Sequence, residues 1–278
     1  MSNNTIITPP TLNDASISIE NKVATLTFMG DDVRNALTGT QLVEDILATA
    51  QWVNTEKQIN ALVITGGGKG FSSGGNIKDM QARRGDFAGS PAELAQRYRD
   101  GIQRMSLAVP AIEVPTIAAI NGAAVGAGFD LACMCDIRIA STKAKMGETF
   151  IKLGIIPGDG GAWFLQQLVG YQRAAELTFS GRVFDADEAN AMGLLLELVE
   201  PDKLMERATA IAQSFAQQPP QALRMAKRLM KSAQRMALPD FLDMCASYQA
   251  ACHHAEDHQI AIDAFVNKDL PSVDFKGW

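Results

Sequence analysis

The stretch Asn121-Gly-Ala-Ala-Val-Gly-Ala-Gly-Phe-Asp-Leu-Ala-Cys-Met-Cys-Asp136 decides how this chain folds. It follows Pro115-Thr-Ile-Ala-Ala-Ile120, a short apolar run typical of a buried strand, and from about Ala127 it continues in residues suited to a helix. The glycines in between allow close approach of other groups to the backbone. Backbone N–H groups of this loop are therefore expected to point into a cleft, beside the positive end of the helix.

The same arrangement occurs earlier in the chain. The apolar run Ala61–Thr65 ends at Gly66-Gly-Gly68, which is typical of a buried strand that leads into a loop. Two N–H donors from different loops of this kind can form an oxyanion hole. The alternative interpretation is that these glycines only close tight turns.

Outward from these loops, strands alternate with helices, which predicts an α/β architecture with crossover connections. A hairpin is expected at residues 16–28, and a continuous helix is expected from Pro91 to Met105. The last strand signal ends at Val199, and the remainder shows only helical periodicity. We predict a core domain at residues 1–200 and a helical C-terminal region at residues 201–278.

Composition excludes several classes of protein. The 278 residues are 47% hydrophobic and 20% charged, which is globular rather than disordered. A formal net charge of −6 provides no general basic field for nucleic acid. No apolar run is long enough to cross a membrane. The first ten residues lack the pattern of a secretory signal and the four cysteines form no disulfide framework, so a cytoplasmic location is expected.

Metal and nucleotide sites are also not expected. Gly66-Gly-Gly-Lys-Gly70 lacks the Ser or Thr that follows the lysine of a P-loop, and the glycines of residues 122–128 have the wrong order for a dinucleotide fingerprint. The three histidines lie near the C-terminus and no cysteine pair has ligand spacing. We predict no metal and no separate cofactor.

Two segments, Phe71-Ser-Ser-Gly-Gly-Asn-Ile-Lys78 and residues 121–136, resemble the two signature segments of the crotonase (enoyl-CoA hydratase/isomerase) superfamily. The resemblance continues in Arg34-Asn-Ala-Leu37, Leu153–Gly161, Phe184–Gly193 and Asp274–Gly277, in the same order. Several motifs in order are far more specific than any one of them.

The resemblance implies a spiral of ββα repeats, with C-terminal helices that pack in a trimer, often paired into a hexamer. It also implies that the substrate is a coenzyme A thioester, so coenzyme A enters as part of the substrate. In the family two backbone N–H groups hold the thioester oxygen, and here they match Gly75 and Ala127. Such donors stabilise the negative oxygen of an enolate.

The family also suggests how the rest of the substrate is bound. The coenzyme's adenine lies against the loop that Ser73, Gly74, Asn76 and Ile77 match. Lys276 is a candidate phosphate neighbour, either within the chain or across a subunit boundary, and the alternative is a solvated lysine. The variable segment at residues 79–90 is expected to line the acyl pocket.

Both glutamates of the family's hydratases are replaced in this sequence. The first is matched by Asp130, which keeps a carboxylate on a shorter arm, and the second by Phe150, which has no acid–base function. We expect Asp130 to move a proton. A site with one carboxylate favours migration of a double bond over addition of water.

Two other acids are candidates for the missing group. If residues 147–151 are extended, Glu148 shares a face with Phe150. Asp159 lies in Pro157-Gly-Asp-Gly-Gly161, one residue after the position, Gly158, at which some relatives carry an aspartate. The alternatives are a surface carboxylate for Glu148 and a helix cap or turn for Asp159.

The sequence therefore predicts an enoyl-CoA hydratase/isomerase type of enzyme with catalytic residues Gly75, Ala127, Asp130, Glu148 and Asp159. One alternative is a thioester hydrolase or dehalogenase on the same fold, with Asp159 as the nucleophile. The other is a non-catalytic coenzyme A-binding or assembly protein.

Overall fold

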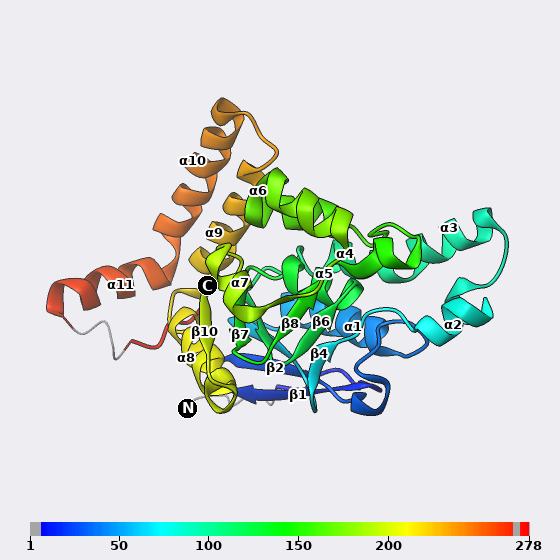
Figure 1. Ribbon diagram of the computed structural model, residues 1–278. Helices are drawn as coiled ribbons and strands as arrows, with labels where there is room; N and C mark the ends of the chain where they lie inside the picture. Colours follow the sequence, from blue (N-terminus) through cyan, green and yellow to red (C-terminus); the bar gives the residue numbers. More distant parts are fainter. Residues whose placement is uncertain (1–6, 269–272, 278) are drawn as a thin grey trace.

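The computed structural model describes residues 7–268 and 273–277. The chain winds in a spiral that contributes strands to two sheets (Figure 1). The strands of the larger sheet, in spatial order, are β1 (Ala15–Glu20), β2 (Val23–Phe28), β3 (Ala61–Gly66), β5 (Thr116–Ile120), β7 (Ile137–Ser141) and β10 (Glu197–Val199). The strands of the smaller sheet are β4 (Gly70–Ser72), β6 (Ala123–Val125), β8 (Lys145–Gly147) and β9 (Phe184–Asp185).

From β3 to β8, successive strands alternate between the two sheets, which produces the predicted spiral. Strands β3, β5 and β7 are parallel neighbours in the larger sheet, and each is followed by a short parallel strand of the smaller sheet, β4, β6 or β8. The predicted hairpin is confirmed, with Glu20 opposite Val23. The sequence analysis missed the short strands because three residues are too few for a periodic pattern.

The helices fill the connections between strands. Those that precede the C-terminal part are α1 (Leu42–Thr55), α2 (Ile77–Ala82), α3 (Pro91–Asp100), α4 (Ile102–Ala108), α5 (Ala127–Met134), α6 (Gly161–Ser180) and α7 (Ala186–Ala191). One large cluster of buried apolar side chains joins the sheets to α1, α4, α5 and α6. The spiral therefore has a continuous core under the loops that lead from the strands.

Two helical segments, one of them predicted above, deviate from regular geometry at glycines. The helix expected from Pro91 to Met105 is interrupted at Gly101, where φ is −111° and ψ is −112°, and this separates α3 from α4. Helix α6 bends at Gly170, where φ is +75° and ψ is 161°. A glycine that leaves the helical region in this way redirects the chain, because the helical hydrogen bonds cannot continue through it.

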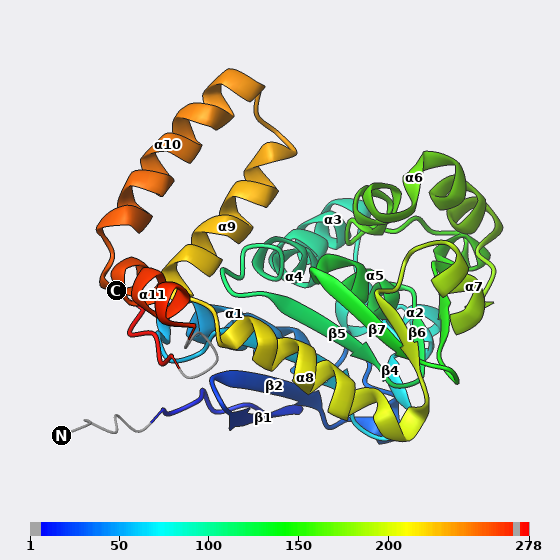
Figure 2. The same ribbon diagram turned by 90° about the vertical axis from the view of Figure 1, so that its left-hand side faces the viewer.

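The C-terminal part is helical, as predicted, with α8 (Leu204–Ala216), α9 (Pro220–Ala233), α10 (Leu238–His254) and α11 (Glu256–Asn267). Helix α8 lies along the larger sheet and buries apolar side chains against β3, β5 and β7 (Figure 2). Packing interactions of the core therefore continue across residue 200. Helices α9–α11 project away from the sheets (Figure 1).

The expected division into domains at residue 200 stays a prediction. None of the helices at residues 7–268 combines the length and the apolar character that a bilayer span requires.

Candidate active site

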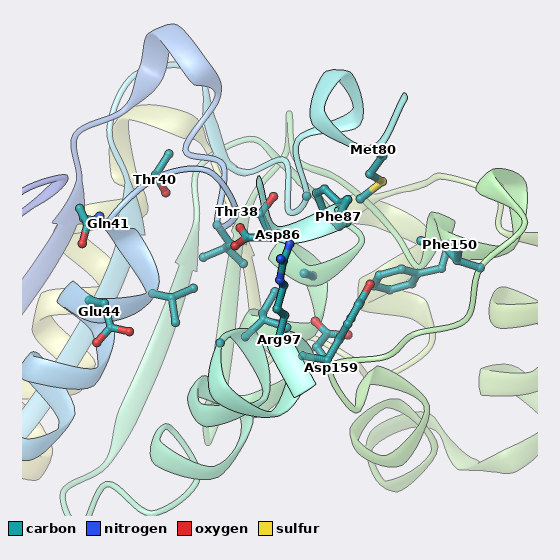
Figure 3. Close-up of a pocket in the computed structure, with 18 residues that line it drawn as sticks. Thr38, Thr40, Gln41, Glu44, Met80, Asp86, Phe87, Arg97, Phe150 and Asp159 are labelled. Carbon is teal, nitrogen blue, oxygen red and sulfur yellow. The ribbon is translucent and has the colours of Figure 1, made fainter. Parts of the chain in front are cut away.

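A cavity of about 250 Å³ lies between α1, the segment that contains α2 and α3, and the first turn of α5 (Figure 3). Phe150 and Asp159 line one end of it, and Thr40, Gln41 and Glu44 line the other (Figure 3). The backbones of Gly75 and Ala127 also line this cavity. The loop that contains Gly75 and the loop before α5 therefore meet at one site, whereas Gly66–Gly68 lead into β4 and do not line the cavity.

The loop at residues 73–76 is pressed against the start of α5. Gly74 has φ of +72°, and a Cβ atom built on it would lie 2.9 Å from the Ala127 nitrogen. The Gly74 N–H donates to the Ser72 hydroxyl at 3.1 Å, which fixes the turn. Glycine is required here because any side chain would push the two loops apart.

The N–H groups of Gly75 and Ala127 are available to a ligand. Ala127 is the first residue of α5, so its N–H has no intrahelical acceptor. Among residues 7–268 and 273–277, neither N–H donates to a protein acceptor. The cavity therefore presents two unused donors from different loops, one of them at the positive end of a helix.

Asp130 lies beneath the cavity rather than on its wall. Its side chain is fully buried in α5 and is absent from the lining residues. A Cβ atom on Gly161 would lie 2.1 Å from Oδ2 of Asp130, so the first residue of α6 rests directly on this carboxyl. Direct contact between Asp130 and a ligand is blocked in this arrangement.

Asp159 is the carboxyl that lines the cavity, although the residue is only 2% exposed. Helix α4 holds its loop from behind. The Gln103 amide donates to the Gly158 carbonyl at 2.8 Å, and the Ser106 hydroxyl donates to the Asp159 carbonyl. The loop at residues 157–161 is thereby fixed with the Asp159 side chain toward the cavity.

Asp130 and Asp159 form a coupled pair. Burial raises the pKa of Asp130 well above its ordinary value, and the negative charge of Asp159 raises it further. Burial also raises the pKa of Asp159, although a hydrogen bond from Asp130 opposes that shift. If neither carboxyl carried a proton, none of their four oxygens would have a hydrogen-bond donor among the described residues. A proton on Asp130 makes it a donor to Asp159.

The condition under which Glu148 would share a face with Phe150, an extended segment at residues 147–151, is not met. Strand β8 ends at Gly147, and Thr149–Leu153 form a 3-10 helix. Glu148 therefore does not alternate with Phe150 along a strand. The Glu148 side chain is buried, accepts a hydrogen bond from the Thr178 hydroxyl of α6, and does not line the cavity. Burial raises the pKa of Glu148.

Phe150 lines the cavity, and the sequence comparison matched it to the second glutamate of the family's hydratases. Its ring lies 3.8 Å from the position of a Cβ atom on Gly126, just before α5. The half-buried ring packs on the apolar core and lines the cavity beside Asp159 (Figure 3). This wall provides packing but no proton transfer.

The expected adenine loop is formed, and its main-chain groups are partly used by the protein. The Ser73 N–H donates to the Arg34 carbonyl at 3.0 Å, and the Asn76 N–H donates to the Thr38 hydroxyl at 2.8 Å. The Asn76 side chain caps α2, and Ile77 is 59% exposed. These features order the loop and leave the Ile77 side chain at the surface.

Lys276 is not among the residues that line the cavity. Its ammonium group pairs with Glu256, and its N–H donates to Asp257 at 2.7 Å. Within one copy of the chain, the structure therefore ties Lys276 to α11 and does not bring it to the other site residues.

Other residues that line the cavity come from the segment that was expected to line the acyl pocket, or from α3. Met80, Asp86 and Phe87 come from the segment at residues 79–90, as predicted. Tyr98 and Arg97 of α3 were missed. The available signal was Tyr98 itself, the single aromatic residue in a helix that has no buried residue.

No group of three or more His, Cys, Asp or Glu residues at residues 7–268 and 273–277 is arranged to hold a metal ion. The predicted independence from metal and from a separate cofactor stays a prediction.

The two interleaved sheets place the chain in the crotonase fold class, because they match solved structures of that fold. The sequence model for enoyl-CoA hydratase/isomerase matches residues 18–276. The chain therefore belongs to the enoyl-CoA hydratase/isomerase family.

Relatives in this family have similar length and fold. A 2,3-dehydroadipyl-CoA hydratase of Escherichia coli is 32% identical over 96% of this chain and 100% of its own. A short-chain-enoyl-CoA hydratase of Clostridium acetobutylicum is 32% identical over 92% and 96%. The structure of an enoyl-CoA hydratase from Bacillus anthracis superposes with a TM-score of 0.88, at 29% identity, over 96% of this chain and 100% of the other.

Proposed function

We propose that this protein catalyses proton transfer on an acyl-CoA thioester through an enolate. In this proposal the N–H groups of Gly75 and Ala127 bind the thioester oxygen, and Asp159 moves the proton. The observation that carries the proposal is that both unused donors and the Asp159 side chain line one cavity.

The chemistry of the thioester requires these groups. Removal or addition of a proton next to the carbonyl places negative charge on the thioester oxygen. Fixed N–H donors lower the energy of that charged state, by about 3 kcal/mol for each donor. The enolate exists only if a base stands beside the same carbon, which is the role of the ionised Asp159.

The roles of the two aspartates differ from the sequence expectation. Asp130 was expected to move the proton, but its side chain lies behind Asp159 and away from the cavity. We assign Asp130 the role of a proton-holding partner, which donates its hydrogen to Asp159 and keeps that group ionised. Asp159 then contacts the substrate.

Proton transfer at the α-carbon is common to migration of a double bond and to addition of water. The sequence favours migration, because Phe150 replaces a glutamate. The relatives favour hydration, since the Escherichia coli and Clostridium acetobutylicum proteins described above are both hydratases. We therefore propose the enolate step, which both reactions share, and do not choose between the two reactions here.

Substrate binding completes the proposal. The coenzyme's adenine is placed against Ser73, Gly74, Asn76 and Ile77, where the surface-exposed Ile77 offers an apolar contact. We retain a homotrimer, or a dimer of trimers, as the assembly. In such an assembly Lys276 would reach the phosphates of a neighbouring subunit's substrate. A cytoplasmic location belongs to the same proposal.

The alternatives make different demands on Asp159. A thioester hydrolase or dehalogenase would use the ionised Asp159 as a nucleophile, whereas the proposed enzyme uses it as a base. Burial raises the pKa of Asp159 above that of an ordinary aspartate. This property suits proton transfer near neutral pH better than nucleophilic attack. A coenzyme A-binding protein without activity would have no need of a carboxyl in the cavity.

The test uses a 3-enoyl-CoA in deuterium oxide, with deuterium uptake followed by mass spectrometry. We expect uptake by the natural protein and a loss of about 10²-fold to 10⁴-fold in Asp159→Asn. Glu148→Gln, a change of a carboxyl outside the cavity, is the matched control and should retain uptake. Asp130→Asn should also retain most of it, because the amide still donates to Asp159.

Three results would contradict the proposal. Loss in Asp130→Asn with full uptake in Asp159→Asn would return the proton-transfer role to Asp130. A covalent adduct on Asp159 would establish the nucleophilic alternative. Tight binding of acyl-CoA without uptake or turnover would favour the binding protein.

A further inference from the structure

Tyr98 brings a phenol to the end of the cavity where Asp159 lies. A Cβ atom on Gly158 would lie 2.9 Å from Cε1 of Tyr98, so the ring is packed against the residue that precedes Asp159. Tyr98 and Asp159 line the same cavity. The ring occupies the space that a side chain at position 158 would enter.

This packing explains the one-residue offset in the loop. An aspartate at position 158 would collide with the Tyr98 ring, because a real Cβ atom is almost never found under 3.0 Å from another atom. A carboxyl at position 159 reaches the cavity instead. Tyr98, Gly158 and Asp159 therefore form one combination of residues, in which the phenol and the carboxyl are neighbours.

The Tyr98 hydroxyl has unused capacity for hydrogen bonding. Within residues 7–268 and 273–277 it makes no hydrogen bond to the protein, and the ring is half-buried. Burial and the nearby charge of Asp159 both raise the pKa of the phenol. The group therefore stays protonated at neutral pH and acts only as a donor or an acceptor, not as a base.

Polar side chains are scarce at this end of the cavity. Phe150 and Ile155 line it with apolar groups, and Gly75 and Ala127 contribute backbone that is assigned to the thioester oxygen. A water molecule held in such a place needs two or more polar partners. The Asp159 carboxylate and the Tyr98 hydroxyl are side-chain partners of opposite kind, one that accepts and one that donates.

We propose that Tyr98 is a catalytic residue that holds the water added to the β-carbon of a 2-enoyl-CoA, in place of the carboxyl that Phe150 replaces. This inference rests on the proposed function. The water oxygen bonds to the β-carbon while Asp159 accepts one of its protons. The electron pair of the double bond forms the enolate, and Asp159 returns the proton to the α-carbon. Tyr98 donates to the water oxygen throughout and is unchanged at the end.

The test separates the addition of water from the enolate step. In Tyr98→Phe we expect hydration of a trans-2-enoyl-CoA to fall about 10²-fold in kcat, because a misplaced reactant costs about that much. Deuterium uptake from a 3-enoyl-CoA, which needs no added water, should fall much less than hydration, because the enolate step does not use the Tyr98 hydroxyl. Tyr171→Phe removes a phenol oxygen from a 72% exposed residue of α6 and is the matched control.

A second variant moves the phenol without removing it. Gly158→Ala should displace the Tyr98 ring and also lower hydration more than deuterium uptake. Hydration by Tyr98→Phe at the natural rate would overturn the inference. Equal losses of hydration and uptake would do so too, because Tyr98 would then only support Asp159. If the natural protein shows no uptake at all, the proposed function fails instead.

Discussion

Asp130 and Asp159 are neighbouring carboxyls, and no cationic side chain among the described residues lowers the pKa of either one. Both are at least 98% covered, and their oxygens lack donors unless one proton is shared. A shared proton lets one carboxyl remain ionised while the other is neutral, as a pair of nearby like charges requires. The folded state therefore binds a proton that the unfolded chain releases.

This proton makes stability depend on pH in a defined direction. Burial raises the pKa of Asp130 in the folded state above its value in the unfolded chain, so its contribution is full at low pH and is lost as pH rises through the folded pKa. Asp130→Asn removes the titrating group. We expect the variant to gain roughly 1 to 3 kcal/mol relative to the natural protein at pH 8. Thermal unfolding of both proteins at pH 5 and pH 8 measures this difference in stability. An equal gain in stability at the two pH values contradicts the prediction.

The catalytic rate should show the raised pKa of Asp159. The base must be ionised, so kcat/KM falls as pH drops through that pKa, at a higher pH than for an ordinary aspartate. In Asp130→Ala the hydrogen bond that lowers the pKa of Asp159 is lost, and the acid limb of the profile should move to still higher pH. Asp130→Asn keeps a donor and serves as the control. If the acid limb of the pH profile is unchanged in Asp130→Ala, Asp130 does not influence the pKa of Asp159, which contradicts the prediction.

At the scale of residues, the sequence predicted several residues of the site but not which carboxyl lines the cavity and which is buried beneath it. Gly75, Ala127, Asp159 and Phe150 were expected at the site and do line the cavity. The order of the two aspartates could not be predicted, because it depends on Gly161, where α6 covers Asp130. Contacts between elements far apart in the chain leave no periodic signal.

At the scale of elements, the loop before α2 and the first turn of α5 form one unit. Gly74 touches both, since a Cβ atom there would lie 2.8 Å from the Val125 carbonyl and 2.9 Å from the Ala127 nitrogen. The positive φ of +72° adds backbone strain for any other residue. The spacing of the two unused N–H groups therefore depends on this glycine.

Gly74→Ala should separate the two donors while leaving the core intact. We expect kcat/KM to fall about 10²-fold, the usual cost of losing one oxyanion donor. Gly193→Ala is a useful control, because it also has positive φ but its Cβ atom meets nothing within 4 Å. Activity should be measured beside the unfolding midpoint. Equal losses of activity in both variants would show that strain alone is responsible.

Element types followed from the sequence where periodicity extended over many residues. The hairpin, the buried strands and the C-terminal helices were predicted near their observed bounds. The differences occurred where one glycine or one short turn decides the geometry, at Gly101 and after Gly147. In those places local propensity is weak, and tertiary contacts select the conformation.

At the scale of the whole molecule, a buried ion pair anchors the projecting helices to the core. Lys227 of α9 lies 2.6 Å from the Asp136 carboxylate and donates to the Val114 carbonyl at 2.7 Å. Burial alone would raise the pKa of Asp136, but the charges of Lys227 and Lys231 hold it below its ordinary value. This contribution to stability is lost as pH falls through the lowered pKa.

Lys227→Met should destabilise the protein by about 3 kcal/mol, because it leaves Asp136 as a buried charge with a weaker partner. Lys231→Met is the matched control, since its ammonium group lies farther away, at 3.4 Å, and is partly exposed. Thermal unfolding compares the two. Limited proteolysis should cut the α9–α10 connection faster in Lys227→Met only.

The projecting helices carry the apolar surface expected of an assembly. Helix α10 has no buried residue, and Phe265 and Val266 of α11 are 69% and 72% exposed. The proposed trimer has a mass of about 90 kDa, from three chains of 29.9 kDa. Phe265→Glu should lower the mass measured by light scattering, whereas Gln259→Glu should not. A single-chain mass for the natural protein would contradict the proposal.

The residues that line the cavity come from two kinds of segment, and this difference affects how the protein can evolve. Gly75, Ala127 and Asp159 are held by the core or by the elements packed on it, whereas Met80, Phe87 and Tyr98 come from a segment whose helices bury no residue. Substitutions in that segment cost little folding energy. New acyl groups, or a new fate for the enolate, are therefore within reach of single mutations that leave the enolate-forming machinery and the fold's stability unchanged.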